Sequence, residues 1–375
     1  GLPANSVYWY RVAAFNADQD SGTATNPPIR VQLGVNAPTG FAGSAISVSS
    51  ITWAWTDNSG NEENFRVRTS TEGALVTLAS NTVSWTEIGL GPNTSWPRHV
   101  SADTTLGHSD SNSDTGWTWA NVPSGPSFSN VAVTSVTGSW SAGAGGAGSY
   151  LLSRSTNSAF AVAVTTPAGA SSGTLTAVSF TDTGLVANTT HYYRVFAYNG
   201  GGVVNPTPGT VASTVTVPAA ATPTAQVATS STSITWSWAA PATGADTQVI
   251  RASSGGAVSV STTSAYTEIG LSPNTLYTRL VRTANASGSS DSVNMSTYTL
   301  ASPPSVPSFS AVAIGAVTVS WTPGAGGAGA YGVVRSTSSN PADLAVVINY
   351  TTLTSTVMAG LTPGTTYYYA IYSFN

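Results

Sequence analysis

The chain is 375 residues long, and 7% of its residues are charged, against roughly 25% in a typical soluble domain. All 11 basic residues are arginine, cysteine is absent, and the formal net charge is −4. The missing Cys and Lys exclude disulfides, cysteine-ligated zinc, lysine Schiff bases and lysine–asparagine cross-links. Scattered arginines argue against a nucleic-acid partner, and no stretch approaches the roughly 18 to 20 apolar residues of a membrane span.

Short runs rich in Val, Ile, Thr, Tyr and Trp alternate along the chain with Gly, Pro, Asn and Ser turns. This alternation predicts an all-β fold. Four tryptophans in strand-like runs mark the repeats, and we expect them in the structural core: Trp53, Trp140, Trp236 and Trp321. Their spacings of 87, 96 and 85 residues predict β-sandwiches of about 90 residues.

The repeats alternate between two types. SSITWAW and WTEIGLGPNT match TSITWSW and YTEIGLSPNT (type A), whereas PSFSNVAVTSVTGSW matches PSFSAVAIGAVTVSW (type B). The expected order is a partial type B unit with late strands only (1–37), A (38–122), B (123–217), A (218–302), and a partial type B unit without its last strand (303–375). Because the first and last sixteen residues are versions of one segment, we expect a window on a longer array. Continuation of the polypeptide is favoured over completion by a neighbour's strands.

The pattern of an early-strand Trp followed by Leu-x-Pro-Asn/Gly-Thr-x-Tyr resembles fibronectin type III. The resemblance covers the whole chain and implies a tandem array of fibronectin type III-like (Ig-like) β-sandwiches of alternating A and B types. It also implies a tyrosine corner, in which the Tyr hydroxyl bonds to backbone a few residues upstream. The corner residues would be Tyr8, Tyr277 and Tyr367. Trp96 and His191 occupy the same slot in two units, where an N–H group could keep the corner bond.

Aromatic and glycine-rich segments are the candidate contact sites. Ile51, Trp53 and Trp55 share one face of a strand, which fits either a sugar-stacking platform or, as favoured here, the core. Trp117 and Trp119 follow the polar run HSDSNSDTG and are possible contact residues. GAGGAG occurs in both type B units and contains Gly145 and Gly326. Since strands follow it, it is a loop and not a dinucleotide fingerprint, and we expect close approach of another backbone there.

No pattern indicates catalysis, a cofactor or a metal. Asp110-x-Asn112-x-Asp114 and Asn16-x-Asp18-x-Asp20 echo a calcium loop but lack its glycine position and its bidentate Glu. The three histidines accompany no catalytic motif. We therefore expect that the chain is not an enzyme.

Two functions remain open. One is a structural segment of a secreted bacterial filament, fibre or sheath, whose partner is itself or a longer copy of the same polypeptide. The alternative is a spacer or glycan-binding accessory region of a secreted polysaccharide-degrading enzyme or adhesin. Both place the chain outside the cell or at its surface, with glycans as possible partners and no membrane insertion. Glycosylation is a further hypothesis, with O-linked glycans on the Ser/Thr surface. Sequons for N-linked glycans, of the form N-x-S/T, occur at Asn93, Asn188, Asn285, Asn294 and Asn349.

Overall fold

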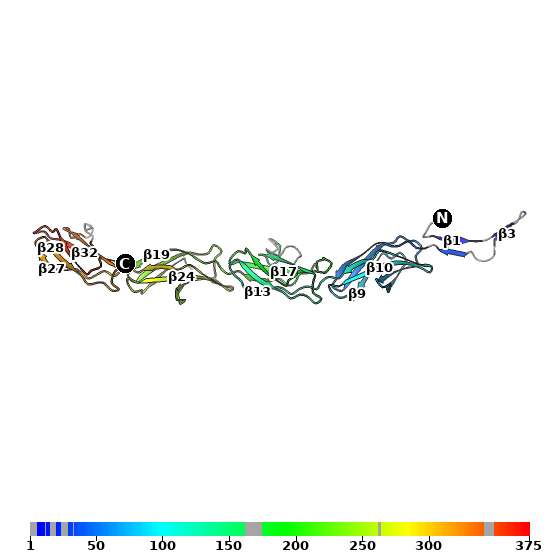
Figure 1. Ribbon diagram of the computed structural model, residues 1–375, viewed down its shortest axis with the longest axis horizontal. Helices are drawn as coiled ribbons and strands as arrows, with labels where there is room; N and C mark the ends of the chain where they lie inside the picture. The colour runs from blue at the N-terminus through cyan, green and yellow to red at the C-terminus, as the bar shows by residue number, and fades with distance from the viewer. Residues whose placement is uncertain are drawn as a thin grey trace. The chain divides into compact units, whose positions relative to one another are not determined.

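The computed structural model describes residues 6–11, 13–15, 20–23, 29–32, 34–161, 175–261, 264–340 and 349–375. Every helix or strand assigned in these ranges is a β-strand, and the strands form small sheets that pack as β-sandwiches in tandem (Figure 1). The predicted all-β class is therefore confirmed. In the same ranges, no helix has the length and apolar character needed to cross a membrane.

Backbone proximity groups the chain into two compact units. Unit 1 comprises residues 1–130, 135–184 and 190–214, and unit 2 comprises residues 131–134, 185–189 and 215–375. The division passes through the expected type B sandwich 123–217. At the N-terminus, β1 (Val7–Tyr10) pairs with β4 (Ile29–Gln32), and β2 (Ala13–Phe15) pairs with β3 (Asp20–Thr23).

The first type A sandwich belongs to unit 1 and has a three-stranded and a five-stranded sheet. The first sheet has the order β5 (Thr39–Ser47), β6 (Ser50–Thr56), β9 (Ser84–Ile88). The second has the order β11 (Gly107–Asp110), β10 (Ser95–Thr104), β7 (Asn64–Thr69), β8 (Ala74–Ala79), with β12 (Asp114–Trp117) also paired to β10. This two-sheet arrangement agrees with the sandwich that the sequence resemblance implies.

Alternation along β6 builds the core of this sandwich. Ile51, Trp53 and Trp55 point to one side of the strand and are buried. Trp53 stacks on Phe41 with ring centroids 5.1 Å apart, and Trp55 lies against Phe65 at 5.8 Å. These rings are therefore core residues and offer no face to a sugar.

A buried ion pair completes that core. Trp53 donates from Nε1 to Oε2 of Glu87 at 3.0 Å, and Nη2 of Arg98 lies 2.6 Å from Oε1 of the same carboxylate. Both carboxylate oxygens thus have partners, which offsets the cost of burying the charge. The second type A sandwich repeats this arrangement with Trp236, Glu268 and Arg279.

The first type B sandwich has two three-stranded sheets. Their orders are β13 (Ser127–Ser129), β14 (Ser135–Ser139), β16 (Ser179–Thr183), and β15 (Ser149–Ser155), β17 (Thr190–Tyr198), β18 (Ala212–Val215). Trp140 is buried beside Tyr150 and Phe180. A different buried group replaces the Trp–Glu–Arg set here. Arg154 and the hydroxyl of Tyr193 both donate to Asp182, at 2.8 and 2.9 Å.

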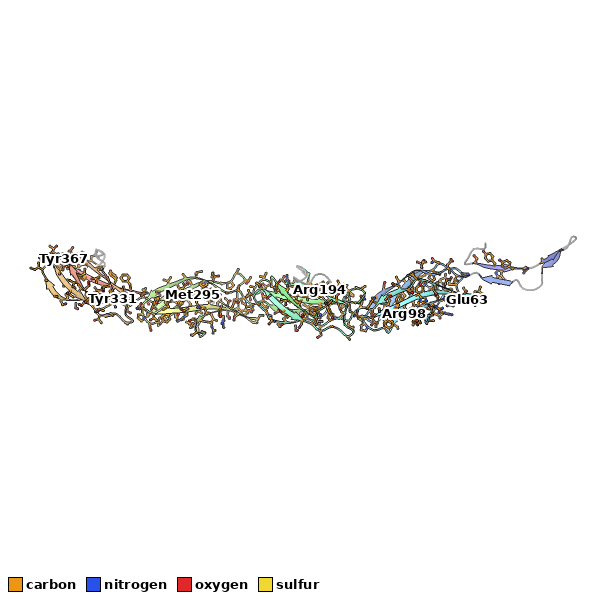
Figure 2. The ribbon with its side chains drawn as sticks, viewed as in Figure 1. Glu63, Arg98, Arg194, Met295, Tyr331 and Tyr367 are labelled. Atoms are coloured by element: carbon orange, nitrogen blue, oxygen red, sulfur yellow. The ribbon has the colours of Figure 1, made fainter. Side chains whose placement is uncertain are left out.

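The second type A sandwich lies in unit 2, with Met295 and Trp238 in its core (Figure 2). One sheet has the order β19 (Thr222–Ser230), β20 (Ser233–Ala239), β23 (Ala265–Ile269). The other has the order β22 (Ala257–Ser261), β21 (Thr247–Ala252), β24 (Leu276–Asn285), β25 (Gly288–Asp291), with β26 (Met295–Tyr298) also paired to β24.

The last sandwich, of type B, has its core around the buried Trp321. Its sheets have the orders β27 (Ser308–Ala313), β28 (Ala316–Ser320), β31 (Ser355–Ala359), and β30 (Asn349–Thr351), β29 (Ala330–Ser336), β32 (Tyr368–Phe374). Met358 stands where the first type B sandwich has Asp182. The buried hydroxyl of Tyr369, the counterpart of Tyr193, therefore has no hydrogen-bond acceptor among the described residues.

Candidate functional site at the joints between sandwiches

Asn93 connects the corner turn of the first type A sandwich to two loops of the following type B sandwich, within unit 1. Its φ of 51° is left-handed, which Asn tolerates better than most residues. Its side-chain Nδ2 donates to the carbonyl of Gly145 at 3.3 Å. Its Oδ1 accepts from the backbone N–H of Gly200 at 2.8 Å. One side chain thus holds both loops.

Glycine is required where the two backbones meet. A Cβ on Gly145 would lie 2.9 Å from the carbonyl oxygen of Pro92, closer than real Cβ contacts. The joint in unit 2 has the same geometry: a Cβ on Gly326 would lie 2.4 Å from the carbonyl oxygen of Pro273. Asn274, the counterpart of Asn93, donates to the carbonyl of Gly326 at 3.3 Å. Both GAGGAG loops therefore contact the preceding corner turn.

The linker backbone of unit 1 is held by asparagine amides. Asn199 donates from Nδ2 to the carbonyl of Thr118 at 3.0 Å, and Asn205 donates to that of Ala120 at 2.9 Å. Both asparagines are buried. In the opposite direction, Asn121 donates to the carbonyl of Ala144 at 2.8 Å. The linker is therefore bound over several consecutive residues.

A buried threonine fastens each linker to the corner turn of its own sandwich. The hydroxyl of Thr118 donates to the carbonyl of Gly91 at 2.6 Å and accepts from the N–H of Thr94 at 3.1 Å. Both hydrogen-bonding roles of the hydroxyl are used. Thr216 and Thr299 make the corresponding pairs of bonds in the next two sandwiches.

Trp117 packs on a glycine pair at the unit 1 joint. A Cβ on Gly200 would lie 2.3 Å from the Trp117 ring, and one on Gly201 would lie 2.6 Å from it. The indole is half-buried there. Trp119 is also half-buried, and its backbone bonds to Ser47 and Asn93. Neither residue forms an open aromatic platform of the kind that stacks on sugars.

A second kind of joint in unit 2 precedes the second type A sandwich. Asn285 donates from Nδ2 to the carbonyl of Thr216 at 2.8 Å and to Oδ1 of Asn188 at 2.9 Å. Asn188 in turn donates to the carbonyl of Thr243 at 3.0 Å. The sequon amides Asn93, Asn188 and Asn285 are therefore engaged in joints, where an N-linked glycan would compete with these bonds.

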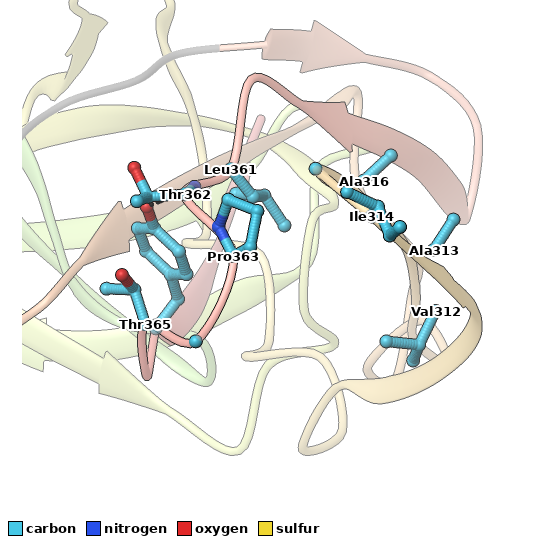
Figure 3. A pocket seen from close by; sticks show the side chains of 11 residues that line it. Val312, Ala313, Ile314, Ala316, Leu361, Thr362, Pro363 and Thr365 are labelled. Atoms are coloured by element: carbon cyan, nitrogen blue, oxygen red, sulfur yellow. Dashed lines mark hydrogen bonds between the residues drawn. The ribbon is translucent and has the colours of Figure 1, made fainter.

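The distal end of the last sandwich carries an apolar groove of about 510 Å³ between the β27–β28 hairpin and the corner turn (Figure 3). Val312 and Ile314 are 78% and 93% exposed in this hairpin. Leu361, Pro363 and Tyr367 line the other wall. Exposed apolar side chains gathered in this way mark an interaction surface.

The corner turns differ among the repeats. The hydroxyls of Tyr277 and Tyr367 accept from the N–H groups of Ser272 and Thr362, at 2.8 and 2.9 Å. The expectation that Trp96 keeps this bond is wrong, because its buried Nε1 finds no hydrogen-bond partner in the ranges that the structure describes. The corner needs an acceptor, and indole only donates. The ring of Tyr8, on β1, has its centroid 6.4 Å from that of the Tyr10 ring.

His191, which also occupies the corner slot, is buried on β17. The calcium-like spacing is not assembled into one site, since Asp114 accepts from the N–H of Gly43 while Asp110 faces His108. The similar run at residues 16–20 lies outside the described residues, except for Asp20.

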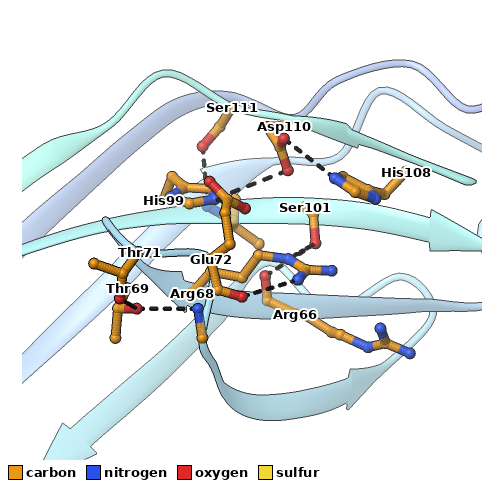
Figure 4. Close-up of polar contacts among 12 residues, drawn as sticks. Arg66, Arg68, Thr69, Thr71, Glu72, His99, Ser101, His108, Asp110 and Ser111 are labelled. Carbon is orange, nitrogen blue, oxygen red and sulfur yellow. Dashed lines mark hydrogen bonds and ion pairs between the residues drawn. The ribbon is translucent and has the colours of Figure 1, made fainter.

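Two histidines and two carboxylates converge in the first type A sandwich (Figure 4). Nε2 of His99, on β10, lies 3.4 Å from Oε2 of Glu72 and 3.9 Å from Oδ1 of Asp110. Nε2 of His108 lies 3.4 Å from Oδ2 of Asp110. Sequence reasoning missed this cluster because its members come from separate hairpins. The signal available was that both histidines are absent from the second type A sandwich.

No protein-family model and no curated protein matches the chain. Among solved structures, the crystal structure of chicken CNTN1 FN1–FN3 domains is similar, with 18% sequence identity and a TM-score of 0.24. The match covers 71% of this chain and 99% of that one. A TM-score of this size does not bear on what the chain does.

Proposed function

We propose that this chain is a structural segment of an extracellular bacterial filament, fibre or sheath, built from copies of its own repeats. The observation that carries the proposal is the joint that recurs in both units. Asn93 with Gly145, and Asn274 with Gly326, make the same contact after equivalent sandwiches. A flexible tether needs no such contacts, whereas a load-bearing array gains from joints held in one geometry.

The exposed groove supports assembly through a further joint. In the first type B sandwich, the segment 131–134 corresponds to the groove hairpin, and the carbonyl of Ala132 accepts from the N–H of Val217 in the linker, at 3.0 Å. The corresponding hairpin of the last sandwich includes the exposed Val312 and Ile314. We assign the occupant of the groove as the linker that leads into another type A sandwich. That sandwich belongs to the same polypeptide or to a second copy.

The nearly uncharged surface is the second support. With 7% charged residues and no lysine, neighbouring molecules meet little electrostatic repulsion or desolvation cost on lateral packing. The same surface needs another source of solubility, and the proposal includes O-linked glycans on its serines and threonines. An intact mass equal to the bare 37.9 kDa polypeptide, measured on material from the native source, would contradict that part.

The alternative role, a spacer or glycan-binding accessory region, gains no support from the tryptophans that the sequence singled out. Trp53, Trp140, Trp236 and Trp321 are buried, and Trp117 covers glycines. Binding of soluble or insoluble polysaccharide without any self-association would favour it over the filament.

Electron microscopy of the purified chain over a range of concentrations tests the proposal. We expect end-to-end assemblies whose length grows with concentration. Ile314→Arg should shorten them because it places a charge in the groove, while Val293→Arg, at a position that is 73% exposed outside the groove, should leave them unchanged. Isolated rods at all concentrations would overturn the proposal.

A further inference from the structure

We propose that the first type A sandwich carries a binding site for one divalent transition-metal ion, zinc in the first instance, formed by Glu72, His99, His108 and Asp110. The site lies away from the joints and does not depend on the filament proposal. Its donor set is two imidazole nitrogens and two carboxylates, which are ordinary ligands of tetrahedral zinc.

The elements bring the four side chains to one place. His108 and Asp110 are two residues apart on β11 and point to the same side. In the pairing of β11 with β10, Ser101 lies opposite Asp110, and His99 precedes Ser101 by two residues on the same face. Glu72 reaches the cluster from the β7–β8 hairpin, as Figure 4 shows.

The distances suit a metal better than direct pairing. Ligand atoms of tetrahedral zinc, each about 2.0 to 2.2 Å from the ion, lie about 3.3 to 3.6 Å from one another. The 3.4 Å separations of His99 from Glu72 and of His108 from Asp110 match this spacing. A strong charged hydrogen bond would bring these atoms to about 2.7 to 2.9 Å. Ligand atoms of Glu72, His108 and Asp110 all lie within 4.8 Å of one another. His99 lies outside that set of three, but its Nε2 approaches two of its members, Glu72 at 3.4 Å and Asp110 at 3.9 Å.

His99 provides the independent sign of a ligand. It is 5% exposed, and its buried Nε2 has no hydrogen-bond partner within the described part of the chain. An unsatisfied buried polar atom costs free energy, and this one is directed at the two carboxylates. The other three side chains are 39% to 63% exposed, so an ion can enter from solvent.

The local charge also fits. Two carboxylates balance one divalent cation. The guanidinium of Arg68, on β7, is engaged in hydrogen bonds: it donates to Ser101 Oγ at 2.9 Å, to Asp103 Oδ2 at 3.2 Å and to the backbone carbonyl of Glu72 at 3.3 Å. Arg68 is therefore held by Ser101 and Asp103, and it shares the Asp103 carboxylate with Arg66.

The second type A sandwich provides an internal comparison. It has the same strands, but Gly255, Leu280 and Ser289 replace Glu72, His99 and His108, and only Asp291 keeps the carboxylate. Asp291 pairs with Arg282 instead, at 2.6 Å. Of the two type A sandwiches, the first thus holds the four donors. The second shows which residues the same fold accepts in their place.

The test measures zinc binding to the whole 375-residue chain, prepared without a polyhistidine tag, by isothermal titration with zinc chloride and by metal content after dialysis. We expect one ion per chain. Glu72→Gly, His99→Leu and His108→Ser, each taken from the second type A sandwich, should each weaken binding at least about tenfold, or ~1.4 kcal/mol. Glu72→Gly also relieves a left-handed non-glycine residue (φ 65°), so its loss of binding would not stem from misfolding.

His191→Tyr is the matched control, since His191 is the third histidine of the chain and lies in the type B sandwich. It should leave zinc binding unchanged. No binding at millimolar zinc would overturn the proposal, as would binding that persists in His108→Ser or is lost in His191→Tyr. Circular dichroism of every variant establishes that the β-fold is retained.

Discussion

The side-chain amide of Asn199 donates a hydrogen bond to the backbone carbonyl of Thr118, 81 residues earlier, at 3.0 Å. Asn285 makes the corresponding bond to the carbonyl of Thr216, at 2.8 Å. In both cases an asparagine at the end of a long strand binds the linker that leads into its own sandwich. Each asparagine therefore binds a backbone carbonyl of the linker and not a linker side chain.

Replacing Asn199 by alanine should loosen the first of these bonds. The buried amide also accepts from the N–H groups of Gly201 and Val203, at 3.1 and 2.8 Å, so three backbone groups lose a partner. We expect a local cost of about 1–3 kcal/mol. Hydrogen exchange of the turn 199–203 should accelerate about tenfold or more. Asn112→Ala, in an exposed loop, should not change it. Unchanged exchange in Asn199→Ala would contradict the hydrogen bonds described here.

Gly200→Ala should be destabilising by about 1–3 kcal/mol, because the new methyl group would overlap the Trp117 ring. Trp117→Ala should remove part of that cost, so the double variant should be more stable than the sum of the two single effects predicts. Denaturant unfolding of the four proteins measures the coupling. Gly60→Ala, where a Cβ meets nothing within 4 Å, is the control. Strict additivity would contradict the packing described here.

The two type B sandwiches should respond in opposite ways to loss of a tyrosine hydroxyl. Tyr193→Phe removes the bond to the buried Asp182 and should cost about 1.5–3 kcal/mol. Tyr369→Phe removes a buried hydroxyl for which the described residues offer no acceptor, so it should be neutral or stabilising. Burial raises the pKa of both tyrosines. Thermal unfolding of the two variants provides the comparison, and equal losses would contradict it.

Asp291 should contribute a small, acid-sensitive stabilisation. Its hydrogen bond from Arg282 lowers the pKa of the carboxyl in the folded chain. Stability from the pair is therefore present above the unfolded pKa of about 3.9 and is lost as pH falls through the lower folded value. Because both side chains are 37% exposed, we expect less than about 1 kcal/mol.

The measurement for this pair is the difference in unfolding free energy between the natural chain and Asp291→Asn. That difference should shrink between pH 5 and pH 2, and it should also shrink in high salt. A difference that grows on acidification would reverse the assigned sign. Asp57→Asn is the control, at a loop position where the carboxylate accepts from the Ser59 N–H and pairs with no arginine among the described side chains.

Much of the fold can be predicted from the sequence because the same pattern of strands and turns recurs in each repeat. The alternation around Trp53 and Trp236 is enough to place both rings in a core, as the buried side chains show. The joints are harder to predict, because Asn199 and Asn285 look like ordinary turn residues until tertiary structure brings a distant carbonyl to them. Trp96 shows another limit: the pattern identifies the corner slot, but only hydrogen-bond chemistry decides whether an indole can fill it.

The cluster at His99 illustrates a third limit. Its four donors are far apart in sequence and match no spacing motif. Strand register alone decides that His99 and Asp110 meet, and a hairpin turn brings Glu72 to them. Comparison of the two type A repeats would have flagged the histidines as a difference in need of a reason.

The asparagine joints bind main-chain carbonyls, and a carbonyl is the same whatever residue carries it. A sandwich inserted, removed or exchanged at such a joint therefore meets the same partner groups as before, provided that its linker keeps the same backbone path. Gene duplication of a whole A–B pair would need no compensating change in the neighbouring surface. The array can thus change its length in steps of two sandwiches while the bonds from asparagine amides to main-chain carbonyls keep the same chemistry.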